Sequence, residues 1–235
     1  MQIQIIEKIQ KELKNLGSPE KSEHFSYFFK TSPGSYGEHD KFLGISVLEI
    51  RNFAKKYLDL SFEDISALLD SEFNESRLLA LVILVNKYKK ANVKQQREIV
   101  DFYIKHADST NNWNLVDLSA KEIVGDWATK TNPEVLFTFA QSPNMWRRRI
   151  AIVGSHAFIT KQQYDVTLRL AELFLNDPQN LIHKATGWML REIGKRNCET
   201  LCAFLDKFAA KMPRVMLSYA IEHFDSEKRK FYRKL

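Results

Sequence analysis

Two residues near the middle of the chain have the types and the spacing to act on a positively charged reacting group. Trp113 and Asp117 lie four residues apart, so a helix would present both on one face. A carboxylate placed there can stabilise developing positive charge, and the tryptophan ring can pack against a sugar or a cation. The alternative is structural, namely a solvated aspartate one turn after a tryptophan that packs in the core.

A run of three arginines, Arg147–Arg149, lies further along the chain. Trp146 and Arg149 are spaced to share a helix face, while the three arginines fan around the helix. A planar guanidinium group binds two phosphate oxygens at once, so Arg148 and Arg149 are candidate ligands of a nucleic-acid backbone. The alternative for part of this run is an ordinary solvated surface.

A third segment carries a cationic stripe with an aromatic ring at its centre. Lys184, Trp188 and Arg191 follow one another at i, i+4 and i+7 of a predicted helix. Gly187 stands in the same segment, where glycine costs about 1 kcal/mol relative to alanine. The close approach of a ligand or of another backbone would explain this glycine, and so would core packing against the next repeat.

If these segments belong to repeats in matching register, their faces converge on one cleft. There the cations would hold phosphates, the aromatic faces would pack against sugar, and the carboxylate would face developing positive charge. Cleavage of an N-glycosidic bond builds such charge on deoxyribose. The residues expected in this cleft are Trp113, Asp117, Arg149, Lys184, Trp188 and Arg191.

Helical periodicity dominates the elements that must position these side chains. An apolar stripe from Ile3 to Leu16 ends at Gly17-Ser18-Pro19, and residues 33–37 form the clearest loop. No pair of strands and no Asn-Gly hairpin is indicated. Further helical patterns fall near 46–58, 61–70, 74–90, 93–106, 111–127, 133–142, 144–160, 163–176, 180–195, 198–211, 213–224 and 226–234.

The helical patterns also repeat. Long helices are predicted to begin near Asn74, Asn111, Asn144, Asn180 and Met212, at intervals of 37, 33, 36 and 32 residues, each followed by a shorter returning helix. Asparagine is a good N-cap, which partly explains its recurrence. This spacing favours an all-α, HEAT-like α-solenoid of stacked antiparallel helix pairs with a concave binding face, formed as a single domain over residues 1–235. An ordinary helical bundle with coincidental spacing is the alternative.

The composition agrees with a helical protein and permits a polyanionic partner. The chain has only 8 Gly and 6 Pro, and its 35 Lys and Arg against 29 Asp and Glu give a net charge of +6. Cys198 and Cys202 lie four apart on a predicted helix, where a disulfide would be strained and two thiols make no zinc site. We expect both cysteines to be buried and reduced, and we expect a soluble cytoplasmic protein, because no signal peptide or membrane span is apparent.

At these motifs the sequence resembles the AlkD-type family of DNA alkylation repair glycosylases. One segment alone is a modest match, but several in order at the family's spacing are specific. Together they extend over nearly the whole chain. The resembling segments are residues 40–45, 113–117, 146–151, 184–192, 213–214 and 219–222.

The resemblance implies a monofunctional DNA glycosylase that hydrolyses the N-glycosidic bond of N3- and N7-alkylated purines in duplex DNA, without a metal or cofactor. Asp117 matches the family's catalytic aspartate, which stabilises the oxocarbenium-like sugar and positions water. Trp113 and Trp188 match tryptophans that contact the deoxyribose of the lesion. The family does not need a base-flipping pocket, unlike most glycosylases.

The resemblance also implies a set of contacts to the DNA backbone. Arg149 with its neighbour Arg148, and Arg191, match residues near the phosphates. Lys184 and Arg214, which stand in two of the resembling segments, complete the predicted DNA-binding residues. The expected partner is double-stranded DNA containing alkylated bases, with no obligate protein partner, so the cytoplasmic protein would associate with the nucleoid when bound.

The sequence departs from the family pattern at Asn114, where an acid is usual, at Asn180-Leu181, where some members have two aromatics, and at Ser218, where a basic residue is frequent. These departures leave the substrate range open. Two other hypotheses remain: a non-catalytic module that recognises bent, branched or damaged DNA, and a protein-interaction solenoid. The arginines favour a DNA-facing groove, and a pure binding module would not need a carboxylate facing a polyanion.

Overall fold

The computed structural model describes residues 2–235, with side chains from residue 4 onward. It divides into two compact units, residues 1–119 and residues 120–235. Within the described residues there is no strand, only an isolated bridge between Lys41 and Phe73. The prediction of an all-helical fold is therefore confirmed.

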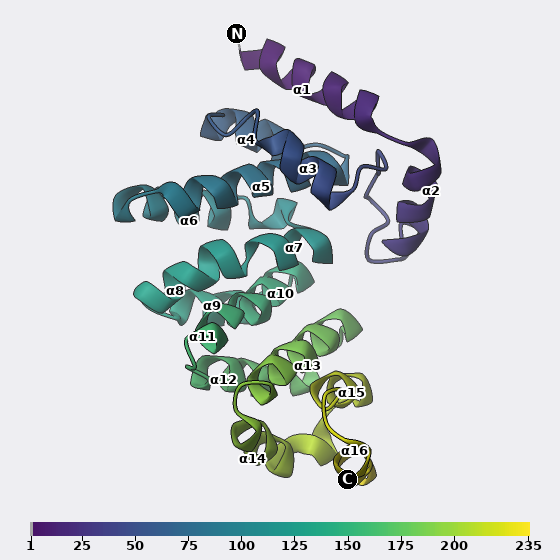
Figure 1. The fold of residues 1–235 in the computed structure, drawn as a ribbon, viewed down its shortest axis with the longest axis vertical. Helices are drawn as coiled ribbons and strands as arrows, with labels where there is room; N and C mark the ends of the chain where they lie inside the picture. Colours follow the sequence, from purple (N-terminus) through teal and green to yellow (C-terminus); the bar gives the residue numbers. More distant parts are fainter. Residues whose placement is uncertain (1) are drawn as a thin grey trace. The chain divides into compact units, whose positions relative to one another are not determined.

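The first unit is built around one buried helix (Figure 1). Helix α5 is packed on nearly all sides, with residues 74–85 and Tyr88 buried, and it contacts α3, α4, α6 and α7. The surrounding helices bury one face each, as Ile50 and Ile65 illustrate. The elements of this unit are α1 (Gln2–Leu16), α2 (Pro19–Phe28), α3 (Val47–Ala54), α4 (Phe62–Leu69), α5 (Asn74–Lys90), α6 (Val93–Lys105), η1 (Ala107–Ser109) and α7 (Trp113–Ser119).

The second unit stacks the first helices of successive pairs against one another. Helix α13 contacts α10 on one side and α15 on the other, which is the neighbour-to-neighbour packing expected of helical repeats. Its elements are η2 (Lys121–Gly125, a π-helical turn), α8 (Asp126–Lys130), α9 (Glu134–Ala140), α10 (Met145–Gly154), α11 (His156–Thr160), α12 (Asp165–Leu173), η3 (Phe174–Asn176), α13 (Asn180–Gly194), α14 (Cys198–Phe208), η4 (Ala209–Lys211), α15 (Arg214–Ala220) and α16 (Ser226–Lys234).

Local sequence sets many helix starts. Ser46 and Ser61 begin α3 and α4 with reciprocal hydrogen bonds to an acid three residues later, and Asn92 begins α6 in the same way with Gln95. Each of these side chains satisfies a backbone N–H that the helix leaves without a partner. The predicted asparagine caps are correct only in part: Asn144 caps α10, whereas the other predicted asparagines do not cap the long helices.

Several of the expectations are wrong. Helix α2 was not predicted; it begins at Pro19, a favourable first helical position, after the capping residue Ser18. The pairs predicted near Asn111 and Met212 do not begin with a long helix, because α7 and α15 have 7 residues each. The cysteines are free thiols but not buried: Cys198 is exposed and Cys202 is half-buried.

Candidate functional site

The first residue of α7, Trp113, is held by aromatic stacking. Its ring stacks on Phe29 with centroids 4.8 Å apart and an interplanar angle of 19°, and Phe28 meets it edge-on at 5.7 Å. Phe29 in turn stacks on Phe42 at 4.8 Å. A largely apolar pocket of about 280 Å³ lies beside these rings. Trp113 is half-buried, so part of the indole stays accessible while the rest is fixed.

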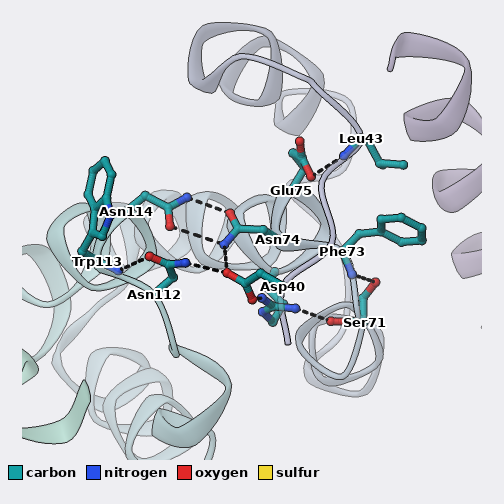
Figure 2. A network of polar contacts seen from close by, with 10 residues as sticks. Asp40, Leu43, Ser71, Phe73, Asn74, Glu75, Asn112, Trp113 and Asn114 are labelled. Carbon is teal, nitrogen blue, oxygen red and sulfur yellow. Dashed lines mark hydrogen bonds and ion pairs between the residues drawn. The ribbon is translucent and has the colours of Figure 1, made fainter. Parts of the chain in front are cut away.

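A buried polar network fixes the start of α7 (Figure 2). The carboxylate of Asp40 pairs with the Arg77 guanidinium and accepts hydrogen bonds from Asn74 at 2.9 Å and Asn112 at 2.6 Å. The side-chain oxygen of Asn112 accepts the backbone N–H of Trp113 at 2.7 Å. The loop before α3 therefore positions the tryptophan through Asp40.

The same network gives a reason for Asn114. Its side-chain amide donates to the Asn74 oxygen at 2.7 Å, and Asn74 donates to Asp40. A carboxylate at position 114 would lack this donor and would bring a second negative charge toward Asp40. The departure from the family pattern is thus accommodated by the partners of Asn74.

Asp117 is the single acidic residue of α7 and is half-buried. Behind this helix Tyr103 is fully buried, and its hydroxyl lies 2.9 Å from that of Ser119. Burial raises the pKa of Tyr103 to about 12, and the negative charge of Asp117 adds to this shift. The neighbouring phenol is therefore neutral at physiological pH, and Asp117 is the side chain of α7 that can carry a negative charge.

The arginine run on α10 is largely engaged within its own unit. Arg148 bonds Asp177 through two nitrogens, at 2.6 and 3.2 Å, and also donates to two backbone carbonyls. Arg149 is 6% exposed and donates to the carbonyl oxygen of Leu181 at 2.8 Å. Trp146 is also buried. These arginines brace the start of α13 and the loop before it, and their predicted role as DNA ligands remains a prediction.

Helix α13 carries the predicted stripe, and the three side chains of the stripe are at least partly exposed. Lys184 is exposed, whereas Trp188 and Arg191 are half-buried. Arg191 forms an ion pair with Glu222, an exposed residue just beyond α15. The ring of His156 on α11 meets Trp188 at a centroid distance of 6.0 Å.

Two ionisable side chains near Trp188, those of His156 and Glu192, have shifted pKa values. Burial, assisted by the nearby Lys121, lowers the pKa of His156 to about 4. Burial alone would raise the pKa of Glu192, but hydrogen bonds from Lys195 and Arg196 lower it to about 2. At neutral pH the tryptophan therefore has a neutral imidazole and an ionised carboxylate nearby.

Gly187 is explained by backbone packing. A methyl group at this position would overlap the carbonyl oxygen of Met216 and lie 2.6 Å from the Cβ of Tyr219, both on α15. The close approach of another backbone and core packing against the next repeat are therefore both observed, since Gly187 is buried against α15. Arg214, at the start of α15, is exposed and donates to the carbonyl oxygen of Arg233 at 2.6 Å.

The predicted site residues fall into two groups. Trp113 and Asp117 lie together on α7 in the first unit. The predicted tryptophan and cations of the second unit lie on α10, α13 and α15; they are Arg148, Arg149, Lys184, Trp188, Arg191 and Arg214. A single cleft that unites both groups remains a prediction.

Several positioning residues were not singled out from the sequence. Asp40 lies in a segment that resembles the family, but its buried pairing with Arg77 had no local signal. Phe29, Asp177 and Glu222 each meet a site residue from a distant part of the chain. In the described part of the chain, no group of three or more His, Cys, Asp or Glu side chains is arranged to hold a metal ion. No helix there is long and apolar enough to cross a membrane.

Comparison with known proteins identifies the fold and the family. The architecture is that of the AlkD-type helical-repeat proteins. The family model described as "DNA alkylation repair enzyme" matches residues 9–224, and the chain therefore belongs to this family.

Two solved structures share the fold. A predicted DNA alkylation repair enzyme from Enterococcus faecalis superposes with a TM-score of 0.70 at 17% identity, covering 89% of this chain and 97% of that chain. AlkD2 from Streptococcus mutans superposes with a TM-score of 0.60 at 16% identity, covering 96% of this chain and 100% of that chain. A search of curated proteins finds no match. These similarities confirm the predicted helical-repeat architecture.

Proposed function

We propose that this protein is a DNA glycosylase that hydrolyses the N-glycosidic bond of N3- and N7-alkylated purines in duplex DNA. The observation that carries the proposal is the pairing of Asp117 with Trp113. A half-buried carboxylate and a partly accessible indole lie one turn apart on a helix whose start is fixed by a buried network. Membership of the DNA alkylation repair family supports the choice of substrate.

The chemistry uses the positive charge of the lesion. An N3- or N7-alkylated purine is a cationic leaving group, so breaking its bond to C1′ returns electrons to the purine and moves positive charge to the deoxyribose. The Asp117 carboxylate would stabilise that charge, and the indole of Trp113 would pack against the sugar. Water adds at C1′ and loses a proton, which yields an abasic site and the free base.

The direct test is the release of free base from duplex DNA that carries one 7-methylguanine. We expect single-turnover excision by the native protein and a loss of about a hundredfold or more in Asp117→Asn, by analogy with other lost electrostatic groups. DNA affinity should hold or rise in this variant, because a negative charge facing a polyanion has been removed.

A matched control is Asp101→Asn, which removes an exposed carboxylate of α6 in the same unit. This variant should excise at the native rate. Unchanged excision in Asp117→Asn would refute the mechanism. Binding without any release of base by the native protein would refute the glycosylase proposal and support a non-catalytic DNA-binding protein.

A further inference from the structure

Two thiols and one ammonium group form a cluster at the start of α14, away from the residues of the proposed function. Cys198 is the first residue of this helix and Cys202 lies one turn later, with their sulfur atoms 3.8 Å apart. These are the two cysteines of the chain. Cys198 is exposed and Cys202 is half-buried, so small solutes can reach the pair.

Lys228 of α16 lies against both sulfur atoms. Its Nζ is 3.3 Å from the Cys198 sulfur, and its ammonium group also contacts the ring of Phe224 at 4.5 Å. Hydrogen bonding to the two thiols, Cys202 first, raises the pKa of Lys228, so this ammonium group stays charged. A fixed positive charge beside a thiol stabilises the thiolate, which is the nucleophilic form.

The other groups at the cluster are consistent with this assignment. The hydroxyl of Tyr232 donates to Asp206 at 2.8 Å, and burial raises the pKa of Tyr232, so the phenol is neutral. The Asp206 carboxylate is engaged by that hydroxyl. Cys198 also occupies the first position of α14 after the capping residue Asn197, where the helix dipole adds positive potential.

We propose that Cys198 and Cys202 form a redox-active dithiol that a hydroperoxide converts into an intramolecular disulfide. The Cys198 thiolate attacks the peroxide oxygen; an S–O bond forms, the O–O bond breaks, and hydroxide leaves to give a sulfenic acid. The Cys202 thiolate then attacks that sulfur; an S–S bond forms and the S–O bond breaks. The sum is two thiols and one hydrogen peroxide converted into one disulfide and two waters.

The position of Cys198 makes closure feasible. A disulfide needs its sulfur atoms about 2.05 Å apart, so the pair must approach from 3.8 Å. In a helix interior this would strain the backbone. Cys198 stands at the very start of α14, where the first backbone N–H groups have no helical partners, so the first turn can adjust while few hydrogen bonds are lost.

Thiol reactivity tests the role of Lys228 independently of any activity on DNA. The rate of alkylation by iodoacetamide near neutral pH should fall about tenfold in Lys228→Gln, because the variant removes the positive charge that stabilises the thiolate. Lys230→Gln on the same helix is the matched control and should react at the native rate. Equal rates in the native protein and both variants would overturn the assignment of Lys228.

Oxidation tests the dithiol itself. With one equivalent of hydrogen peroxide, the intact native protein should lose about 2 Da as a monomer, the mass of two hydrogen atoms. Cys202→Ser should instead be trapped by dimedone at Cys198, and Cys198→Ser should show no trapping. Disulfide-linked dimers or sulfinic acid in place of the internal disulfide would overturn the proposal.

Discussion

The stacking of Trp113 on Phe29 means that this tryptophan has a structural role besides any contact with a substrate. Trp113→Ala should lower the free energy of unfolding by about 2 kcal/mol, less than the usual cost of a fully buried tryptophan, because the ring is only half-buried. Trp113→Phe keeps a ring on Phe29 and should lose less than half as much. Urea unfolding compares the two variants, and equal losses would show that the stack contributes nothing.

His156 makes stability depend on pH in a predictable direction. Its pKa is lowered from 6.5 to about 4 in the folded protein, so the folded state disfavours the protonated imidazole. The corresponding stabilisation is present above pH 6.5 and is lost as the pH falls toward 4. His156→Phe keeps a ring beside Trp188 and removes this loss, so its stability should rise relative to the native protein between those pH values. Parallel stability–pH curves for the two proteins would contradict this expectation.

The sequence identified which site residues share a helix face, but not what holds them. The spacing of Trp113 and Asp117, and of Lys184 and Trp188, correctly predicted their faces because helix periodicity is a local property. Arg148 shows why the rest was not predictable. Its partner Asp177 lies 29 residues further along the chain, beyond any periodic pattern.

At the scale of elements, the loop before α3 is tied to α5 through one buried ion pair. Arg77 and Asp40 have side chains that are 5% and 2% exposed. Asp40→Asn leaves the guanidinium buried without its counter-charge, which should cost about 3–5 kcal/mol in free energy of unfolding. Denaturant unfolding of the purified variant measures this cost.

A neighbouring ion pair provides the control for Asp40. Lys41 pairs with Glu72 at 2.6 Å, with side chains 63% and 55% exposed, and joins the same loop to the turn just before α5. Glu72→Gln should change the free energy of unfolding by less than about 1 kcal/mol, since solvent already screens the pair. Similar losses in the two variants would mean that burial does not decide the strength of these pairs.

The sequence predicted the presence of most helices more accurately than the residues at which they begin and end. The patterns over 74–90 and 93–106 correspond closely to α5 and α6, because the long apolar run of α5 and the capping box of α6 are local signals. Helix α2 was missed because it has no buried residue and hence no apolar stripe. The break of the 111–127 pattern at η2 depends on how the backbone packs, which periodicity does not report.

At the scale of the whole molecule, the net charge of +6 does not show which cations can reach a polyanion. Arg77 and Arg148 are paired with buried carboxylates, and Arg149 donates to a backbone carbonyl. Lys184 is exposed, whereas Arg191 is paired with Glu222. The affinity for DNA should therefore depend on whether such surface pairs can be exchanged for phosphate contacts.

Glu222 offers a way to measure that exchange. Its exposed carboxylate pairs with Arg191, so a phosphate that binds Arg191 must displace it. Glu222→Gln removes this competitor and should strengthen binding to duplex DNA by about two- to fivefold, the free energy of an exposed ion pair. The control is Glu199→Gln, at an exposed glutamate of α14. It makes the same change in net charge and should have a smaller effect.

Titrations at several salt concentrations separate the effect of freeing Arg191 from the effect of net charge, because charge-dependent affinities fall as salt rises. Equal gains in the two variants would show that only net charge matters and would place Arg191 outside the DNA interface.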